Sequence, residues 1–380
     1  MSERERVVVV GGGAAGLSTA AALSRHGIDA LVIDRSERVG ESWRSRYERL
    51  HLHTIRRFSG LAHRGIPRRY PRYLSKDQYA EYLEEYATRL GLRVALGEAV
   101  TAVRPGWRVE TARRTLDADV VVIATGHYLE PRIPAWDGRD AFEGRLLHSS
   151  AYRSGSEFAG RRAVVVGLGN SGAEIATDLV EQGAASVSVA MRTTPPIVTR
   201  EMFGVVPVQL FGITLMPLGM PRLVDRVGAK LRRRAVGDLR PYGLGVAAWG
   251  PFTARRPAVI DVGFLGVLKA GHVAVRPALE RLTTHGVEYA DGSTEDVDVV
   301  VAATGFGTGL GRLLADVPGV VGEDGQPLAR SGSPTAARGL YFIGFDETIR
   351  GHLFEARKES KRLARTIERD LTRARGTSSA

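Results

Sequence analysis

Two short glycine-rich stretches have the residue types and the spacing that hold a dinucleotide. The first follows an apolar run at residues 7–10 and has the order G-x-G-x-x-G, with glycines at Gly11, Gly13 and Gly16. A tight turn, the close approach of the backbone to a diphosphate, and close helix–strand packing each exclude a side chain at such positions. The next apolar run ends at Asp34, whose carboxylate is placed to accept hydrogen bonds from ribose hydroxyls. These residues predict a site for one dinucleotide.

The second stretch repeats this arrangement farther along the chain. It again follows an apolar run, and it contains Gly167, Gly169, Asn170, Ser171 and Gly172. After the returning apolar run stands Arg192, where the first site has an acid. An arginine suits the 2′-phosphate of NADPH, which an aspartate would repel. We therefore expect NADPH at the second site, with an ordinary surface role for Arg192 as the alternative.

Two different dinucleotide sites in one chain indicate hydride transfer between two cofactors. A flavin accepts a hydride and passes electrons onward one or two at a time, so the first site is expected to hold FAD. The chain has no cysteine, which excludes the redox disulfide of flavin disulfide reductases and every thiolate metal site. Dioxygen is then the expected electron acceptor, and no metal is expected. Two alternatives stay open: an NADPH-dependent flavin oxidase or reductase, and an inactive binding module with a flavoprotein fold.

The elements that must position these loops are two βαβ units. Each glycine loop lies between a predicted strand and a predicted helix, and each helix leads to another strand. The strands and helices of the two units are expected at residues 7–10, 14–26, 30–33, 163–166, 171–182 and 186–190. Further elements are an amphipathic helix at 76–90, strand-rich segments at 93–123 and 273–302, a strand at 340–343 and a helix up to residue 371.

This pattern predicts an α/β fold with two Rossmann-like dinucleotide-binding domains, the NADP domain being inserted into the FAD domain. The FAD domain is expected at residues 1–155 and 289–371, and the NADP domain at 156–288. Residues 200–256 of the NADP domain are expected to form a lid-like excursion. The last residues, 372–380, are expected to be a disordered tail.

Composition limits the classes of partner. The chain carries 53 Lys and Arg against 42 Asp and Glu, but its arginines are spread out without a basic tail, so no nucleic-acid partner is expected. The uncharged stretch 202–221 is interrupted by Pro207, Pro217 and Pro221, which argues against an integral membrane span. We expect it to cover an apolar pocket, with loose membrane-surface contact as the alternative.

The N-terminal residues resemble a strand and not a signal peptide, so a cytoplasmic protein is expected. A homo-oligomer is left open.

Residues just before the second glycine loop carry a family resemblance. Phe142, Gly144, His148 and Tyr152 reproduce the signature F-x-G-x-x-x-H-x-x-x-Y, so the chain resembles the class B flavoprotein monooxygenases. In Baeyer–Villiger enzymes of that class the last position is typically Trp. Tyr152 therefore favours the branch of flavin-containing and N-hydroxylating monooxygenases.

The C-terminal third is similar to the YUCCA-type indole-3-pyruvate monooxygenases. The similar segments are I-D-V-G, G-V-E-Y-A-D-G and G-L-Y-F-I-G-F, at residues 260–263, 286–292 and 339–345. Two stretches depart from that family. Residues 54–56 read T-I-R in place of L-P-K, and a run that is less charged in those proteins here contains Asp346, Glu347 and Arg350. The departures leave the expected fold and cofactors in place, but they leave the substrate open.

The resemblance also implies which residues contact the cofactors. His53 and Asn170 are expected to hold the nicotinamide and the oxygenated flavin during catalysis. Cofactor-binding roles are implied for Gly40, Trp43, Arg44, Gln78, Thr125, Gly126, Thr304 and Gly305. His148 is expected to link the two domains.

The implied activity is an FAD- and NADPH-dependent monooxygenation of a small molecule by dioxygen. In that family oxygen adds at flavin C4a, giving a (hydro)peroxide that the closed site shields from water. A deprotonated peroxide attacks a carbonyl, which leads to oxidative decarboxylation of a 2-oxo acid or to Baeyer–Villiger insertion, whereas a protonated one oxygenates nitrogen or sulfur. The sequence does not determine whether the peroxide is protonated. We expect a hydrophobic or aromatic substrate, whose carboxylate would lie near Arg200 or Arg222.

Overall fold

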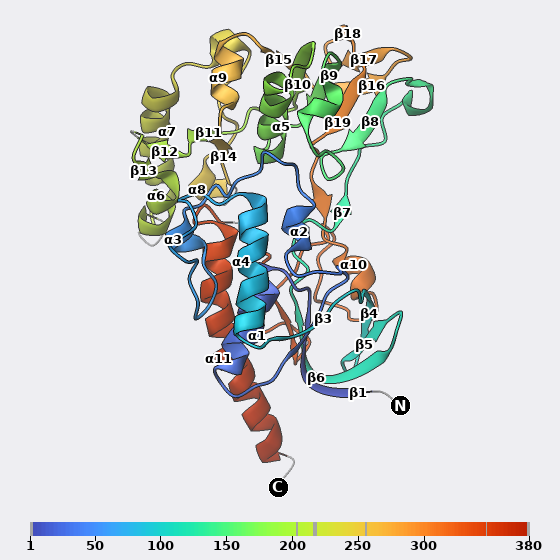
Figure 1. The fold of residues 1–380 in the computed structure, drawn as a ribbon, viewed down its shortest axis with the longest axis vertical. Coiled ribbons are helices and arrows are strands. Elements are labelled where there is room, and N and C mark those ends of the chain that lie inside the picture. Colours follow the sequence, from blue (N-terminus) through green and yellow to red (C-terminus); the bar gives the residue numbers. More distant parts are fainter. Residues whose placement is uncertain (1–2, 203, 216–218, 255–256, 347, 378–380) are drawn as a thin grey trace.

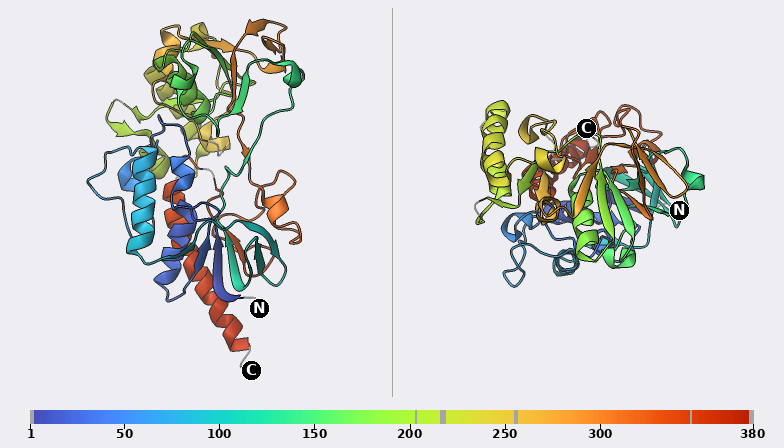
Figure 2. Two further views of the ribbon diagram at one scale, coloured as in Figure 1. Left: turned by 45° about the vertical axis from the view of Figure 1, so that its right-hand side comes forward. Right: turned by 90° about the horizontal axis from the view of Figure 1, so that it is seen from above.

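The computed structural model describes residues 3–202, 204–215, 219–254, 257–346 and 348–377 (Figure 1). These residues form two α/β lobes, which lie one above the other in Figure 1 and in the left view of Figure 2. The chain crosses from the lower lobe to the upper one and back, and a short antiparallel pair joins the two crossings. This pair consists of β7 (Glu130–Pro131) and β20 (Phe306–Gly307).

The lower lobe is built on a seven-stranded sheet. Its strands run in the order β3-β2-β1-β6-β5-β4, and β21 also pairs with β6. The strands are β1 (Glu3–Val10), β2 (Leu31–Ile33), β3 (Arg93–Ala95), β4 (Val100–Arg104), β5 (Arg108–Thr111), β6 (Thr115–Ile123) and β21 (Leu340–Phe342). The pairs among β3, β2, β1, β6 and β21 are parallel, and β4–β5–β6 form an antiparallel meander. The buried valines of β1 and β6 explain why these two strands form the centre of the sheet.

Three long helices lie side by side against one face of this sheet (Figure 1). They are α1 (Ala14–Ser24), α4 (Lys76–Arg89) and α11 (His352–Thr377). A buried hydrogen bond between the hydroxyls of Ser18 and Ser360, 2.8 Å apart, joins α1 to α11. Shorter helices of this lobe are α2 (Glu41–Arg44), α3 (Arg56–Ser59) and α10 (Leu310–Leu313).

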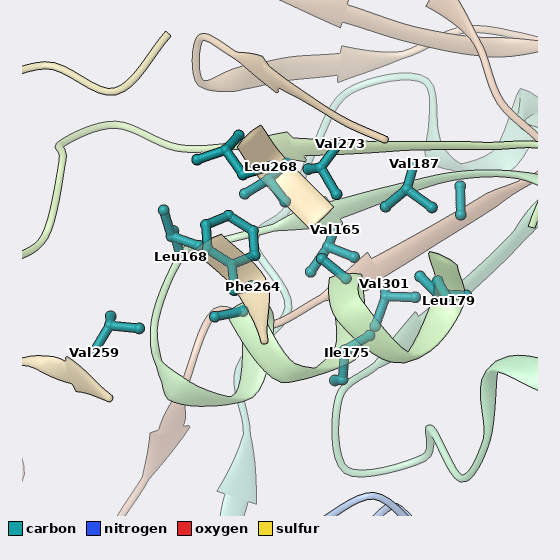
Figure 3. Close-up of a cluster of buried hydrophobic side chains, with 14 of the residues drawn as sticks. Val165, Leu168, Ile175, Leu179, Val187, Val259, Phe264, Leu268, Val273 and Val301 are labelled. Carbon is teal, nitrogen blue, oxygen red and sulfur yellow. The ribbon is translucent and has the colours of Figure 1, made fainter. Parts of the chain in front are cut away.

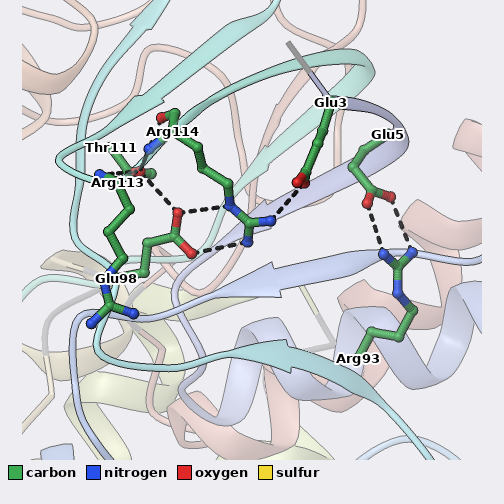
Figure 4. A network of polar contacts seen from close by, with 7 residues as sticks. All are labelled: Glu3, Glu5, Arg93, Glu98, Thr111, Arg113 and Arg114. Atoms are coloured by element: carbon green, nitrogen blue, oxygen red, sulfur yellow. Dashed lines mark hydrogen bonds and ion pairs between the residues drawn. The ribbon is translucent and has the colours of Figure 1, made fainter. Parts of the chain in front are cut away.

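An ion-pair network ties the edge of this sheet together (Figure 4). The buried carboxylate of Glu98 accepts from Arg114 at 2.9 Å, and this hydrogen bond is the main reason that the pKa of Glu98 is lowered. Arg93 of β3 pairs in the same region with Glu5 of β1 at 2.7 Å. Glu3 and Glu5 lie in the first half of β1, whereas the first glycine loop follows its last residue, Val10.

The upper lobe is built on a parallel sheet with the strand order β15-β10-β9-β19-β8. These strands are β8 (Arg145–His148), β9 (Arg162–Val166), β10 (Ser186–Ala190), β15 (Val273–Arg276) and β19 (Val299–Ala302). An antiparallel ribbon follows β15 and consists of β16 (Leu279–Leu282), β17 (Gly286–Tyr289) and β18 (Thr294–Asp296). Helices α5 (Asn170–Glu181) and α9 (Phe264–Lys269) pack on the sheet through Ile175, Leu179, Phe264 and Leu268 (Figure 3).

The two sheets confirm the inserted arrangement, but they place its limits differently from the expected range 156–288. Strands β8 and β19 lie on either side of that range, and both belong to the upper sheet. They do so because their apolar residues, such as Leu147 and Val301, are buried in the upper lobe. We therefore propose an upper domain of about residues 132–305. The C-terminal end also differs, since α11 continues through residues 372–377, which the sequence pattern had suggested to be disordered. Residues 378–380 lie outside the described part of the chain.

The expected lid region, residues 200–256, and the residues that flank it contain several short elements beside the upper sheet. They are β11 (Ile197–Thr199), β12 (Glu201–Met202), β13 (Val206–Pro207), α6 (Val208–Leu215), α7 (Pro221–Val236), α8 (Pro251–Ala254) and β14 (Val259–Asp261). Single turns of 3₁₀ helix occur at Arg139–Ala141, Gly155–Phe158 and Arg240–Tyr242. Buried Gln209 of α6 contacts the lower lobe, because its amide donates to the Arg350 carbonyl at 2.8 Å and accepts from the Ile55 N–H at 3.2 Å. In the described part of the chain, every helix is too short or too polar to cross a bilayer.

Candidate functional site

The first glycine loop has the close contacts that its sequence requires. Gly11 has a φ of 111°, and a Cβ there would lie 2.6 Å from the Ala124 carbonyl oxygen. A Cβ on Gly16 would lie 1.9 Å from the Gly11 carbonyl oxygen. Both positions therefore admit only glycine, because the end of the neighbouring strand β6 and the loop itself fill the space.

Gly13 differs from its two neighbours because it faces open space. It is the N-cap of α1, no side chain caps that helix end, and a Cβ there would meet no described atom within 4 Å. At the edge of the loop, Asp34 accepts from the Gly12 N–H at 2.6 Å and from the Ser36 N–H at 2.8 Å. Free N–H groups at a helix N-terminus attract a diphosphate, and a fixed carboxylate beside them suits a ribose. The loop thus fits one half of a dinucleotide.

The second glycine loop repeats this geometry. A Cβ on Gly167 would lie 2.6 Å from the Ala303 carbonyl oxygen, and one on Gly172 would lie 1.9 Å from the Gly167 carbonyl oxygen. Gly169 caps α5 and would meet no described atom within 4 Å. Arg192 follows β10, is exposed, and forms no ion pair with any residue that the structure describes. A second diphosphate therefore fits at α5, with a free guanidinium farther along the same sheet edge.

Four residues expected near the flavin lie together where α2 meets α4. Gly40 is needed for this contact, since a Cβ would come within 2.9 Å of the Ala80 backbone. Trp43 packs edge-on against Tyr79 at 4.6 Å between ring centroids. Arg44 pairs with Glu84 at 2.6 Å. Gln78 completes a capping box at the start of α4, where its side chain accepts from the Ser75 N–H at 3.0 Å.

The residues at the two crossings differ in whether their polar groups have hydrogen-bond partners. The buried hydroxyl of Thr125 has no hydrogen-bond partner among the described residues, and Gly126, with a φ of 71°, faces open space. At the second crossing, the Thr304 hydroxyl donates to the Arg132 carbonyl, and Gly305 has a φ of 86°. A buried hydroxyl without a partner is costly, so a bound group beside Thr125 would remove that cost.

His53 joins the lower lobe to the upper one. Its Nε2 lies 2.7 Å from the Oε1 of Glu174 on α5, and Glu174 is only 2% exposed. The second oxygen of Glu174 is buried without a partner in the described part of the chain. The buried phenol of Tyr47 interacts with both Glu174 and Ser171, and its pKa is raised well above the usual value, mainly by burial and then by the Glu174 charge. The lobes therefore share a buried polar cluster.

The sequence analysis missed Glu174. An acid in the otherwise apolar segment G-A-E-I-A was the available signal, because a charge on the buried side of a helix requires a partner. Asn170, which was predicted to act in catalysis, begins the same helix. Its Oδ1 accepts from the Ile260 N–H at 2.7 Å, which leaves its amide NH₂ as the group that can face a ligand.

The signature residues connect the crossings to α5. His148 Nδ1 accepts from the Ser150 N–H at 3.1 Å, so its Nε2 donates to the Gly305 carbonyl at 2.9 Å. Burial lowers the pKa of His148, which favours this neutral form. The Tyr152 hydroxyl donates to Asp178 of α5 at 2.7 Å. His148 thus contacts the return crossing, and its role as a link between the two domains stays a prediction.

The positions that depart from the YUCCA pattern mostly have partners inside the protein. Arg350 pairs with buried Glu355 at 2.5 Å, and Asp346 accepts from the Ser331 N–H at 3.3 Å. The Thr54 hydroxyl bonds to the Ser59 hydroxyl at 2.7 Å. Glu347 lies outside the described residues. These side chains thus have partners within the lower lobe, while the backbone of Ile55 and Arg350 bonds to Gln209 of α6.

Comparison with known proteins gives a consistent result. Residues 8–204 match the family described as pyridine nucleotide-disulphide oxidoreductase. The chain is 37% identical to indole-3-pyruvate monooxygenase YUCCA1 of Oryza sativa subsp. japonica, over 90% of this chain and 86% of that protein. It is 34% identical to indole-3-pyruvate monooxygenase YUCCA6 of Arabidopsis thaliana, over 95% of this chain and 90% of that protein.

Solved structures show the same fold at lower identity. A flavin-containing monooxygenase from Stenotrophomonas maltophilia superposes with a TM-score of 0.73 at 23% identity, covering 96% of this chain and 98% of that one. Cyclohexanone monooxygenase with bound epsilon-caprolactone gives 0.73 at 20% identity, covering 98% and 89%. The bacillithiol disulfide reductase of Bacillus cereus gives 0.70 at 20% identity, covering 97% and 99%.

Proposed function

The chain belongs to the class B flavoprotein monooxygenases, and from this premise we propose that it converts an aromatic 2-oxo acid to the carboxylic acid one carbon shorter. It is an NADPH-dependent flavin monooxygenase whose cofactors are FAD and NADPH. The observation that carries the proposed reaction is the 37% identity, over 90% of the chain, to a protein named for indole-3-pyruvate. In the balanced reaction, the 2-oxo acid, O₂, NADPH and a proton give the shorter acid, CO₂, water and NADP⁺.

The first loop and its surroundings would hold FAD. The open helix end at Gly13 would receive the diphosphate, and Asp34 would bind the adenosine ribose. Thr125 would donate its free hydroxyl to the cofactor at the crossing. Gly40, Trp43, Arg44 and Gln78 would act mainly by fixing α2 on α4, since Arg44 and Gln78 already have partners in the protein. When bound, the reduced flavin supplies the chemistry that activates dioxygen.

The second loop would hold NADPH. The open end of α5 at Gly169 would receive the diphosphate, and Arg192 would bind the 2′-phosphate. The free amide of Asn170 would donate to the nicotinamide portion, because the contact with Ile260 already fixes its orientation. Thr304 and Gly305 would line the return crossing beside it.

The chain's own contribution to the reaction is to position groups and exclude water. The contact between His53 and Glu174 holds the two lobes in one relative orientation. Gln209 closes α6 onto the lower lobe over residues 55 and 350. Contacts that fix both lobes would shield reactive oxygen species from water and orient the carbonyl of the substrate.

The test is a stoichiometric assay with purified protein, FAD, NADPH and indole-3-pyruvate. We expect one CO₂ for each NADPH consumed and little hydrogen peroxide. NADPH consumption that yields only hydrogen peroxide, unchanged by the 2-oxo acid, would instead support an NADPH oxidase. Oxygenation of amines or sulfides without CO₂ release would instead indicate that the enzyme oxygenates nitrogen or sulfur. The matched control is Gly169→Val, which should abolish NADPH consumption while FAD remains bound.

A further inference from the structure

Arg46 occupies the junction of the two lobes. Its guanidinium carbon lies 5.4 Å from the ring centroid of Tyr128, just after the first crossing, and 5.4 Å from that of Phe306, in the second crossing. The two rings contact each other edge-on at 5.4 Å, and Phe306 also packs on His148 at 4.7 Å. A cation is thus held against two aromatic side chains where the lobes meet.

Arg46 differs from Arg44 and Arg49, because each of those two arginines is paired with an acid. Arg49 forms a two-point ion pair with Glu181, and Arg44 pairs with Glu84. Arg46 has no carboxylate within ion-pair distance among the described residues, and its Nε donates to the Ser42 carbonyl at 3.2 Å. Its pKa is lowered by burial and, more weakly, by the neighbouring charge of Arg153. An external anion would relieve this cost.

The phosphates of the two cofactors have other sites. The helix ends at Gly13 and Gly169 are open for diphosphates, and Arg192 is free for a 2′-phosphate. The two arginines that the sequence had suggested for a substrate carboxylate are less suitable. Arg200 stacks on Tyr73 at 4.0 Å, and Arg222 is exposed at the start of α7. Among the described residues, Arg46 is a cation at the junction that contacts the rings of both crossings and has no ion-pair partner.

We propose that Arg46 binds the carboxylate of an aromatic acid substrate, which the rings of Tyr128 and Phe306 help to hold between the lobes. The inference rests on the proposed function and assigns its substrate anchor. A guanidinium offers a carboxylate two parallel hydrogen bonds, which a lysine does not, and the ring faces add apolar contact. Aromatic 2-oxo acids have both of the required groups, whereas neutral aromatic compounds lack the anion.

The experiment measures binding to the FAD-loaded protein saturated with NADP⁺. The probes are indole-3-acetate and its neutral counterpart indole-3-acetamide, followed by flavin fluorescence. Arg46→Met should weaken acetate binding about tenfold or more and change acetamide binding less than about twofold. Arg46→Lys should recover part of the affinity for the acid. The matched control is Arg57→Met, since Arg57 is an exposed arginine near Phe58 at 5.9 Å and should have no effect.

Other outcomes would overturn the assignment. Equal weakening of both probes would mean that Arg46 only supports the fold, and a rise in the Kd of NADP⁺ without a change for the acid would mean that it binds the dinucleotide. If the wild type decarboxylates indole-3-pyruvate but Arg46→Met binds the acid normally, Arg46 is not the anchor and the proposed function stands. If the wild type neither binds the acid nor decarboxylates the 2-oxo acid, both proposals fail. Retained FAD and an unchanged circular-dichroism spectrum establish that each variant is folded.

Discussion

The Nε2 of His53 lies 2.7 Å from a carboxylate oxygen of Glu174, and this contact crosses from one lobe to the other. The two residues are far apart in the sequence, and Glu174 is buried at the interface. A buried carboxylate is stable only with a partner, so the contact favours one relative orientation of the lobes. The cofactors proposed for the two lobes would meet in that orientation.

The pair should behave as a unit when it is mutated. His53→Asn and Glu174→Gln should each lower kcat, and the double variant should lose little more than either single variant, because the same contact is lost each time. In denaturant unfolding, a double-mutant cycle should give a coupling free energy of about 1–3 kcal/mol. Strictly additive effects on both kcat and stability would mean that the two side chains act independently.

The first glycine loop predicts opposite results for two similar substitutions. Gly13→Val should fold normally but lose FAD, because the new side chain meets no described protein atom and enters the space proposed for the diphosphate. Gly16→Val should destabilise the fold by about 3 kcal/mol or more, since its Cβ would lie 1.9 Å from the Gly11 carbonyl oxygen. The checks are the ratio of FAD absorbance to protein absorbance and thermal unfolding. Full FAD content in Gly13→Val would refute the first-site assignment.

Arg192 should distinguish the two nicotinamide cofactors. Arg192→Ala should raise the KM for NADPH by roughly 10–100-fold, which corresponds to the loss of a charged hydrogen bond, and should leave the KM for NADH nearly unchanged. Arg233→Ala, which removes an exposed arginine from α7, is the control and should alter neither constant. Equal changes in the two constants for Arg192→Ala would remove the basis for 2′-phosphate recognition.

Glu359 should make the stability of the protein depend on pH. Burial, followed by the charges of Asp346 and Glu355, raises its pKa to about 8 from the ordinary value of 4.5. As pH rises from about 4.5 to 8, the unfolded chain releases this proton and the folded protein retains it, so stability falls over this window and then levels off. Glu359→Gln should therefore add stability that grows to on the order of 3–5 kcal/mol at pH 8.

Chemical unfolding of the purified protein at pH 6, 7, 8 and 9 would check this effect. Glu323→Gln is the control, because the side chain of Glu323 is exposed and has no ion pair with any residue that the structure describes. A difference between wild type and Glu359→Gln that stays constant with pH would contradict the raised pKa.

The features that depend on local sequence could be predicted. Both glycine loops and Asp34 follow from steric and hydrogen-bonding requirements within one βαβ unit, and the structure has them where the sequence suggests. Helix α4 likewise matches its expected range to within one residue, since its capping box and apolar spacing lie within the helix itself. The inserted topology was predicted because two separate βαβ units occur in one chain.

Features that depend on distant contacts could not be predicted. No local pattern pairs His53 with Glu174, and none shows that β8 and β19 join the upper sheet, because strand pairing is decided by the folded lobe. The free charge of Arg46 becomes visible only when all its neighbours are known. Helix α7 was not predicted, although a local signal for it exists. Leu223, Val227 and Leu231 have helical spacing after Pro221.

The central claim is that dioxygen is divided between the organic product and water. The direct measurement is mass spectrometry of the acid formed from indole-3-pyruvate and NADPH under ¹⁸O₂. The account predicts one ¹⁸O atom in each product carboxylate, with one CO₂ released and one NADPH oxidised. An acid that contains no ¹⁸O, with the NADPH electrons recovered as hydrogen peroxide, would contradict it.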